Sequence, residues 1–357
     1  MNSKAFLLPA ALMIAGNSVA NSKGKKTDKR PNILVILADD LGYSDLGCYG
    51  SEIHTPNLDK LAQQGVRFNH FYNASRSCPT RASLLTGLYQ HQAGIGRMTF
   101  DDNLPGYRGT LSRNAVTIAE VLKESGYTTS MIGKWHVAET PLRKDQREWL
   151  AHHVYHDTYS DLCHYPVNRG FDSHYGTIYG VVDYFDPFSL VEGEVPVKEV
   201  PEGYYITQAL SDRAAEEVTE YAKDDKPFFM YLAYTAPHWP LHALPEDIEK
   251  YKDTYKVGWE AIRNARYERQ KQLGIFPGMD DFLSERQFKD RWEDNAHAEW
   301  DARAMAVHAA MIDRMDQGIG QVIDALEKTG QLDNTLILFL SDNGCSNENC
   351  QNYSPGE

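Results

Sequence analysis

The chain contains four short apolar runs that are separated by longer and more polar stretches. Each run holds six to eight residues and is rich in branched or aromatic side chains. None of them alternates cleanly between apolar and polar positions, and this pattern is typical of strands buried on both faces of a parallel sheet. We therefore predict four buried strands, at Asn32–Ala38, Thr128–Gly133, Pro227–Tyr234 and Thr335–Ser341.

Two short helices are predicted from the signals at their ends. Thr55 can cap a helix that has Pro56 in its first turn and ends at Gly65. Thr117–Glu120 has the pattern of a capping box and opens a second helix, which ends at Gly126. Both helices lie between predicted strands, as expected of strand–helix–strand units.

Two longer helices are expected at Thr207–Lys223 and Ala296–Lys328, the second interrupted by Gly318 and Gly320. Strands that alternate with helices are joined by right-handed crossovers, which place helices on the faces of the sheet. No internal repeat or low-complexity tract is visible. We predict an α/β sandwich with a central, mostly parallel sheet flanked by helices.

A cluster of polar residues follows each predicted strand. In open parallel sheets ligands bind beyond the carboxyl ends of the strands, so we expect the four clusters to meet at one edge of the sheet. One such cluster alone would be an ordinary solvated strand end, but four of them predict an active site. The clusters are Asp39-Asp40, Lys134-Trp135-His136, Ala236-Pro237-His238 and Asp342-Asn343-Gly344.

The composition is that of a globular protein with an acidic surface. Hydrophobic residues make up 42% and charged residues 24% of the 357 positions, which excludes a disordered or collagen-like chain. The formal net charge of −14 makes DNA, RNA and anionic lipid poor partners. The five cysteines are sparse and odd in number, which excludes a disulfide framework.

The N-terminus has the pattern of a secretory signal peptide. Lys4 precedes an apolar stretch, Phe6–Ala15, and small residues follow at Ser18–Ala20. We predict a signal peptide at residues 1–20, with cleavage at its end, and a polar linker at residues 21–30. The apolar stretch is too short to span a bilayer, so we expect a periplasmic or secreted protein without a membrane anchor.

The most specific motif is the segment Ser75–Gly87, with the sequence SRSCPTRASLLTG. It closely resembles the signature of the type I sulfatases, which belong to the alkaline phosphatase superfamily. The first position of that signature, a Cys or Ser two residues before a proline, is Ser77 here, and Cys78 falls on the variable position. The resemblance implies that Ser77 is oxidised to formylglycine by a radical sulfatase-maturing enzyme.

The resemblance covers residues 31 to 350, because the motifs after the other strands follow in the order of the family. It implies an alkaline phosphatase-like sandwich and one sulfatase catalytic domain at residues 31–357. The family carries a further active-site lysine and a small C-terminal subdomain downstream, whereas no lysine follows Lys328 in this chain. We therefore expect a chain without that subdomain, as a fragment of a longer enzyme or as a degenerate remnant.

Four oxygen-bearing side chains suit a hard cation, and they are Asp39, Asp40, Asp342 and Asn343. With an oxygen of Ser77, they form a cage for Ca²⁺ or Mg²⁺. No thiolate or imidazole is needed, which argues against zinc. Either pair alone would also suit a turn or a cap. Their positions after predicted strands favour metal ligands, and we expect Ca²⁺, with Mg²⁺ as the alternative.

The resemblance also implies a role for each remaining site residue. Arg81 lies one helical turn after Ser77 and would clamp an oxyanion. Lys134 would bind the sulfate oxygens, and His136 would be the base that releases sulfate from the modified residue. His238 would bind the leaving ester oxygen and help to protonate it.

These residues predict a hydrolase that removes sulfate from aryl or carbohydrate sulfate monoesters. The acidic surface favours a sulfated small molecule or a glycan terminus over a long polyanion. The alternatives are a phosphatase or phosphonate monoester hydrolase of the same superfamily, or an inactive truncated remnant. We further expect the segment Ala151–Leu190 to line the substrate pocket, with Tyr184 and Phe185. The charged stretch Tyr251–Gln272 should form a solvated helical face.

Overall fold

The computed structural model describes residues 30–139, 158–277, 283–284 and 291–346. The predicted signal peptide (1–20) lies outside these residues, as does all but the last residue of the predicted linker (21–30). Within the described part, no helix combines the length and the apolar character that a membrane crossing needs.

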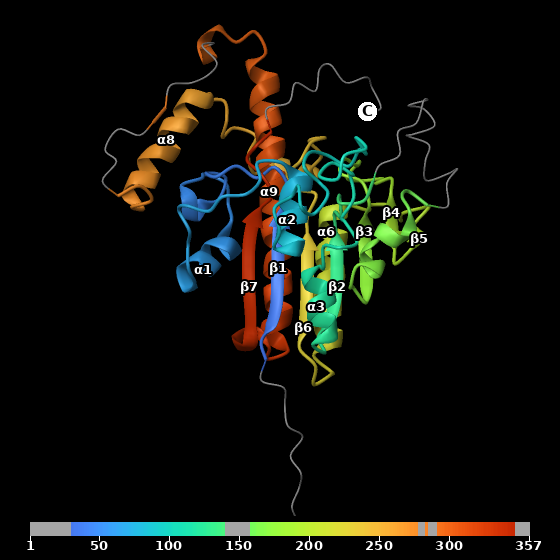
Figure 1. Cartoon of the computed structure of the whole chain (residues 1–357). Coiled ribbons are helices and arrows are strands. Elements are labelled where there is room, and N and C mark those ends of the chain that lie inside the picture. The colour runs from blue at the N-terminus through green and yellow to red at the C-terminus, as the bar shows by residue number, and fades with distance from the viewer. Residues whose placement is uncertain (1–29, 140–157, 278–282, 285–290, 347–357) are drawn as a thin grey trace, which may run out of the picture.

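A seven-stranded sheet forms the centre of the protein, as Figure 1 shows. Its strands are β1 (Asn32–Ala38), β2 (Thr128–Gly133), β3 (Ser173–Thr177), β4 (Leu190–Glu192), β5 (Val195–Pro196), β6 (Phe228–Ala233) and β7 (Thr335–Ser341). Their order across the sheet is β5-β4-β3-β2-β6-β1-β7. The neighbouring strands β3, β2, β6, β1 and β7 pair in parallel. Strands β4 and β5 pair antiparallel and form the edge of the sheet beside β3. The predicted fold class, a mostly parallel sheet flanked by helices, is thus confirmed.

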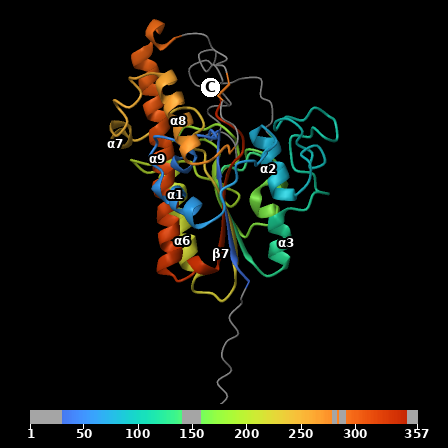
Figure 2. The same cartoon turned by 90° about the vertical axis from the view of Figure 1, so that its left-hand side faces the viewer.

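Helices cover both faces of this sheet (Figure 2). They are α1 (Pro56–Gln64), α2 (Ser77–Thr86), α3 (Ile118–Glu124), α6 (Ile206–Tyr221), α7 (Pro245–Glu249), α8 (Trp259–Gln272) and α9 (Ala298–Lys328). Single 3₁₀ turns lie at Gly47–Tyr49, Leu162–His164, Pro166–Asn168, Trp292–Asp294 and Leu332–Asn334. Helices α1, α6 and α9 lie on one side of the sheet, and α2 and α3 lie on the other.

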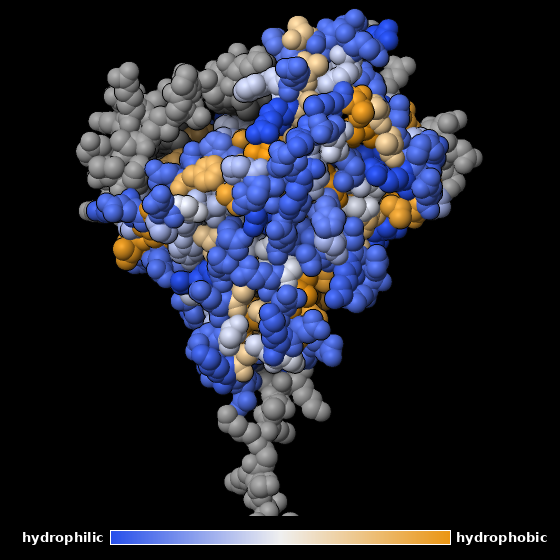
Figure 3. Space-filling model, turned by 180° about the vertical axis from the view of Figure 1, so that it is seen from behind, coloured by the Kyte–Doolittle hydropathy of each residue, from blue (hydrophilic) through white to orange (hydrophobic). Residues whose placement is uncertain are grey.

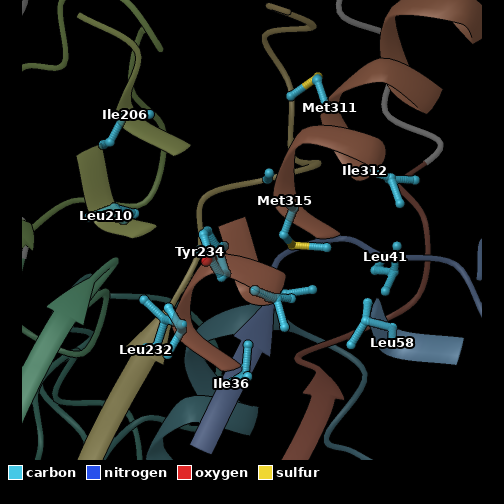
Figure 4. Close-up of a cluster of buried hydrophobic side chains, with 14 of the residues drawn as sticks. Ile36, Leu41, Leu58, Ile206, Leu210, Leu232, Tyr234, Met311, Ile312 and Met315 are labelled. Atoms are coloured by element: carbon cyan, nitrogen blue, oxygen red, sulfur yellow. The ribbon is translucent and has the colours of Figure 1, made fainter. Parts of the chain in front are cut away.

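Two hydrophobic cores follow from the alternation of side chains along the central strands. In β1, Leu34 and Ile36 join the core under α6 and α9, whereas Val35 and Leu37 join the core under α2 and α3. Strand β6 alternates in the same way. Figure 4 shows part of the first core, where Ile36 of β1 and Leu232 of β6 lie on the side of the sheet that α9 covers. The apolar runs do not alternate in sequence because each face of these strands meets its own core.

Helix α9 differs from the prediction because it runs unbroken through both of its glycines. A Cβ on Gly318 would lie 2.0 Å from Oγ of Ser211, and one on Gly320 would lie 2.5 Å from Nδ2 of Asn57. The glycines therefore allow α6 and the start of α1 to approach α9 closely. They are packing positions and not helix breaks.

The cap of α1 also differs from the prediction. The Thr55 side chain makes no capping bond to the helix. Instead, the two carboxylate oxygens of Asp316, on α9, accept hydrogen bonds from the backbone N–H groups of Asn57 (3.1 Å) and Leu58 (2.8 Å). The capping box at Thr117, by contrast, is confirmed at the start of α3.

The sequence pattern predicts that β7 is buried on both faces. In the structure one face of β7 is exposed. It is the last strand of the sheet, and Leu336 and Leu338 are 49% and 44% exposed. The view from behind is mostly hydrophilic with scattered apolar patches, consistent with the acidic composition (Figure 3).

The charged stretch Tyr251–Gln272 is only partly a solvated helical face. Within it, Arg266 of α8 is largely buried and forms ion pairs with Asp45 and Glu52. Tyr267 is also buried. Helix α8 therefore packs on the loop that follows β1, and its charges are used in that contact.

Candidate active site

The four polar clusters meet at one edge of the sheet. Strands β2, β6, β1 and β7 are adjacent and parallel, so their carboxyl ends lie side by side. The residues that follow these ends are Asp39 and Asp40, Lys134 and His136, His238, and Asp342 and Asn343. Helix α2 brings Ser77 and Arg81 to the same edge.

Ser77 stands at the centre of the polar contacts. It is the first residue of α2, where free backbone N–H groups favour an anion. Its Oγ lies 3.0 Å from Nε of Arg81 and 3.2 Å from Nδ1 of His136. A hydroxyl held between a guanidinium and an imidazole can act as a reactive group, since the guanidinium binds anions and the imidazole can take a proton.

Cys78, the neighbouring residue, points away from the site. Its side chain is fully buried in the core under α2 and α3, with Sγ 3.9 Å from Sδ of Met98. Burial raises the pKa of the Cys78 thiol to about 12, so it stays protonated and unreactive. The geometry therefore favours Ser77 over Cys78 as the residue available for chemistry.

Arg81 is fully buried and connects three parts of the site. Its guanidinium donates to Oδ2 of Asp342 at 2.8 Å and to the carbonyl of Lys134 at 2.8 Å. It also lies 3.5 Å from Oδ1 of Asp39. Burial alone would raise the pKa of Asp342, but Arg81 and Lys134 outweigh it and hold that pKa well below its usual range.

Asp39 has an acceptor atom that the described residues do not satisfy. Lys134 donates to its Oδ2, but Oδ1 is buried and accepts no hydrogen bond among the described residues. Burial raises the pKa of Asp39 well above its usual range, and the nearby carboxylates of Asp342 and Asp40 raise it further against the charge of Lys134. A bound cation would stabilise this cluster of carboxylates, because it would supply the missing positive charge.

Asp40 and its neighbours complete the donor set. Nδ2 of Asn343 donates to Oδ1 of Asp40, and Nε2 of His238 lies 3.5 Å from Oδ2 of Asp40. Donor atoms of Asp39, Asp40 and His238 all lie within 4.8 Å of one another. Asp342 faces Arg81 with one oxygen and accepts the Asp40 N–H with the other, at 3.2 Å. The residues present thus fit a hard, oxygen-ligated cation.

Both histidines of the site are neutral. Burial lowers the pKa of His238 to about 3 and lowers that of His136 well below its usual range, helped by the charge of Lys134. Nδ1 of His238 is hydrogen-bonded to the carbonyl of Trp239. Because a carbonyl only accepts, Nδ1 carries the proton, and Nε2 is the nitrogen that faces Asp40.

Backbone strain marks two of these residues. Asp40 and His136 have φ values of 60° and 54°, a conformation that residues other than glycine adopt rarely. Such strain often accompanies functional positions, where the surrounding contacts hold it in place. Gly180 is one such contact, since a Cβ there would lie 2.2 Å from the ring of His136. No pattern in the sequence signals the role of Gly180.

The expected pocket-lining segment divides into parts with different positions. Residues 151–157 lie outside the described residues. Tyr184 is expected to line the substrate pocket, but it does not line an open pocket in the structure. It is 1% exposed and packs under the loop of His238. Phe185 lines an open hollow of about 500 Å³ together with Asp186 and Lys198 to Tyr204, but no candidate site residue is among its lining, so its part in a substrate pocket stays a prediction.

Comparison with known proteins identifies the family. The Sulfatase family model matches residues 31–357. An arylsulfatase of Klebsiella aerogenes is 34% identical over 353 residues, which cover 97% of this chain and 72% of the relative. An uncharacterized sulfatase of Schizosaccharomyces pombe is 35% identical over 342 residues, which cover 88% of this chain and 58% of the relative.

Solved structures agree with these relatives. Ps i-CgsB, crystallised in complex with k-i-k-neocarrahexaose, is 32% identical with a TM-score of 0.61, over 89% of this chain and 59% of that structure. A phosphonate monoester hydrolase of Agrobacterium radiobacter is 22% identical with a TM-score of 0.50, over 88% of this chain and 62% of that structure, and shares the fold. The chain thus spans between about half and three quarters of these proteins' lengths. It belongs to the sulfatase family.

Proposed function

We propose that this protein hydrolyses sulfate monoesters of aryl groups or carbohydrates. The observation that carries the proposal is the position of Ser77, whose Oγ lies within hydrogen-bond distance of both Arg81 and His136 beside a group of carboxylates. Relatives named as arylsulfatases support the same reaction.

Ser77 is proposed to be oxidised to formylglycine by a radical sulfatase-maturing enzyme, which is then a partner during biosynthesis. Hydrated formylglycine supplies two hydroxyls, of which one attacks sulfur and displaces the alcohol, and the other loses its proton so that sulfate leaves. A plain serine would form a stable sulfate ester, since it has no second hydroxyl. The buried thiol of Cys78 takes no part.

Asp39, Asp40, Asp342 and Asn343 are proposed to hold a divalent cation together with residue 77. Their oxygen atoms suit Ca²⁺, with Mg²⁺ as the alternative. The cation would supply charge that neutralises sulfate oxygens and acidifies the attacking hydroxyl. The support is the unsatisfied, buried Oδ1 of Asp39.

The remaining side chains act on the substrate or on its protons. Arg81 and Lys134, both fully buried cations, bind the sulfate oxygens. His136 is neutral, because burial lowers its pKa, so its Nδ1 can accept the proton that releases sulfate. His238 presents Nε2 to the site, and only the form that is protonated at Nε2 binds the leaving oxygen and donates a proton to it.

The proposed substrate is a sulfated small molecule or the sulfated terminus of a glycan. The net charge of −14 would repel a long polyanion outside the site itself, and it also disfavours nucleic acid. The signal-peptide pattern at residues 1–20 supports a periplasmic or secreted location. The domain at residues 31–357 is proposed to carry the catalytic machinery described above.

Fragmentation mass spectrometry of the tryptic peptide Ser77–Arg81 tests this function, with protein made alongside a serine-type maturase. We expect a loss of two hydrogens at residue 77. Ser77→Ala should abolish arylsulfatase activity, whereas the matched Cys78→Ala should retain most of it.

Other outcomes have definite meanings. Formylglycine at Cys78 instead, recognised by replacement of the thiol sulfur with oxygen together with the loss of two hydrogens, would show that the register is wrong by one residue. An unmodified peptide, with a control substrate of the maturase modified, would favour an inactive protein. Faster hydrolysis of an aryl phosphate than of the matching aryl sulfate would favour a phosphatase or phosphonate monoester hydrolase.

A further inference from the structure

A tyrosine from a distant segment holds the loop that carries His238. Tyr184 lies in the connection between β3 and β4, and it is 1% exposed. Its hydroxyl lies 2.7 Å from the carbonyl of Thr235 and 2.8 Å from the carbonyl of His238. One side chain thus contacts both ends of the four-residue turn that follows β6.

Two backbone hydrogen bonds also hold the turn, one of them from the N–H of Asp39 to the carbonyl of Ala236 at 3.0 Å. The backbone N–H of His238 donates to the carbonyl of Thr235 at 3.1 Å. The carbonyl of Thr235 also accepts a hydrogen bond from the hydroxyl of Tyr184. This bond links the turn to the β3–β4 connection. Burial raises the pKa of Tyr184 well above its usual range, so the hydroxyl stays protonated and donates. A hydroxyl has a single proton, so the two carbonyls share it, and because Thr235 also accepts the His238 N–H, the loss of the hydroxyl would fall mainly on the carbonyl of His238.

The orientation of the His238 ring depends on this turn. Nδ1 bonds to the backbone carbonyl of Trp239, so the ring follows the main chain. Nε2, on the other side of the ring, lies 3.5 Å from Oδ2 of Asp40. A shift of the turn by about 1 Å would therefore move Nε2 by a similar amount, which is enough to cost about 100-fold in rate.

We propose that Tyr184 is a positioning residue that fixes His238 against the leaving oxygen of the substrate. This inference rests on the proposed function, in which His238 assists the departure of the alcohol. It predicts that Tyr184 matters most for substrates whose leaving group needs a proton. Good leaving groups, such as 4-nitrophenolate, need little such help.

Tyr184→Phe tests the proposal, with Tyr234→Phe as the matched control. Tyr234 is also a fully buried tyrosine beside the same turn, but its hydroxyl bonds to Ser211. Values of kcat and KM are measured for phenyl sulfate and for 4-nitrophenyl sulfate, and thermal unfolding is followed for each protein. For Tyr184→Phe we expect kcat to fall about 10-fold or more with phenyl sulfate and less than about 3-fold with 4-nitrophenyl sulfate. Tyr234→Phe should change kcat by the same factor for both substrates.

A double-mutant comparison shows whether Tyr184 acts through His238. In a His238→Ala background, Tyr184→Phe should change the ratio of the two kcat values no further. If Tyr184→Phe does not fold, 3,5-difluorotyrosine at position 184 keeps the ring and strengthens the donor. The ratio of the kcat values for the two substrates must then differ from that of the wild type. An unchanged ratio overturns the proposal.

The two proposals fail in different ways. A wild-type protein without activity on either sulfate ester, and with an unmodified Ser77, would overturn the proposed function. An active wild type in which Tyr184→Phe lowers both rates equally would overturn only the role of Tyr184. A further change of the ratio in the His238→Ala background would do the same.

Discussion

Gly180 packs directly against the imidazole of His136. A Cβ on Gly180 would lie 2.2 Å from Cε1 and 2.3 Å from Nε2 of His136, so the ring would have to move. We predict that Gly180→Ala turns the ring away from Ser77 and lowers kcat by about 100-fold, because a misplacement of about 1 Å can cost that much. Steady-state kinetics with an aryl sulfate measures the loss.

Gly193 provides the control for that variant. It has a positive φ of 63°, and a Cβ there would meet no atom within 4 Å. Gly193→Ala should therefore cost about 1 kcal/mol of stability, through backbone strain, and leave kcat unchanged. Normal kcat in Gly180→Ala would contradict the inferred packing. Equal losses in both variants would show that the effect comes from stability.

The meeting of the polar side chains at the candidate active site could be predicted from the sequence, but the residues that hold them in place could not. Asp39 and Asp342 each follow a recognisable apolar run, so their meeting at the sheet edge follows from strand direction. Gly180 and Tyr184 act through contacts with residues 44 or more positions away, and nothing in their own neighbourhood signals this. Their roles depend on tertiary geometry alone.

At the scale of elements, the start of α1 depends on a carboxylate from another helix. Asp316 of α9 accepts hydrogen bonds from the first backbone N–H groups of α1. We predict that Asp316→Ala lowers the free energy of unfolding by about 2 kcal/mol, because one buried and one partly buried N–H group lose their acceptor. Urea denaturation measures the change.

Thr117→Ala removes a local cap and provides the comparison. Thr117 accepts a hydrogen bond from the N–H of Glu120 at 3.1 Å, within the capping box of α3. The loss of the cap should cost about 1 kcal/mol, and the loss of the bond from the same hydroxyl to the carbonyl of Arg169, at 2.8 Å, adds to that cost. A smaller cost for Asp316→Ala than for Thr117→Ala would show that the contact between α9 and α1 contributes little to stability.

Elements with a strong local pattern were predictable, and short or context-dependent ones were not. The runs that became β1, β2, β6 and β7 are apolar and six or more residues long, whereas β4 and β5 have only three and two residues. The cap of α1 was assigned to Thr55 because its side chain has the right chemistry. In the structure the hydroxyl of Thr55 accepts a hydrogen bond from the N–H of Gly47 at 2.9 Å. Asp316 accepts the hydrogen bonds of the first N–H groups of α1 instead.

At the scale of the whole molecule, the site joins the two ends of the described chain. Asn343 donates to Asp40 across a separation of 303 residues, and Asp342 accepts from Arg81 across 261. The sequence could predict that these residues share an edge, but the order of strands across the sheet depends on crossovers that local patterns do not encode. Any change that loosens β7 from β1 should therefore also disturb the candidate active site.

His174, in the part of β3 that pairs with β2, couples the stability of the sheet to pH. It lies in β3 and is 1% exposed, and burial lowers its pKa to about 4, with backbone groups of Gly193 and Gly133 offsetting only part of the effect. A histidine in the unfolded chain has a pKa of about 6.5. Between these values the unfolded state binds the extra proton, so stability present above about pH 6.5 is lost as the pH falls toward about 4.

The loss attributable to His174 should reach about 3 kcal/mol, since each unit of pKa difference corresponds to about 1.4 kcal/mol. Urea denaturation at about pH 7 and about pH 4 measures it by comparing wild type with His174→Gln, which cannot take up the proton. His70→Gln, at an exposed histidine, should retain the full dependence of the wild type. If His174→Gln loses as much stability on acidification as the wild type, then the carboxylates alone cause the acid sensitivity, and the buried imidazole of β3 does not contribute to it.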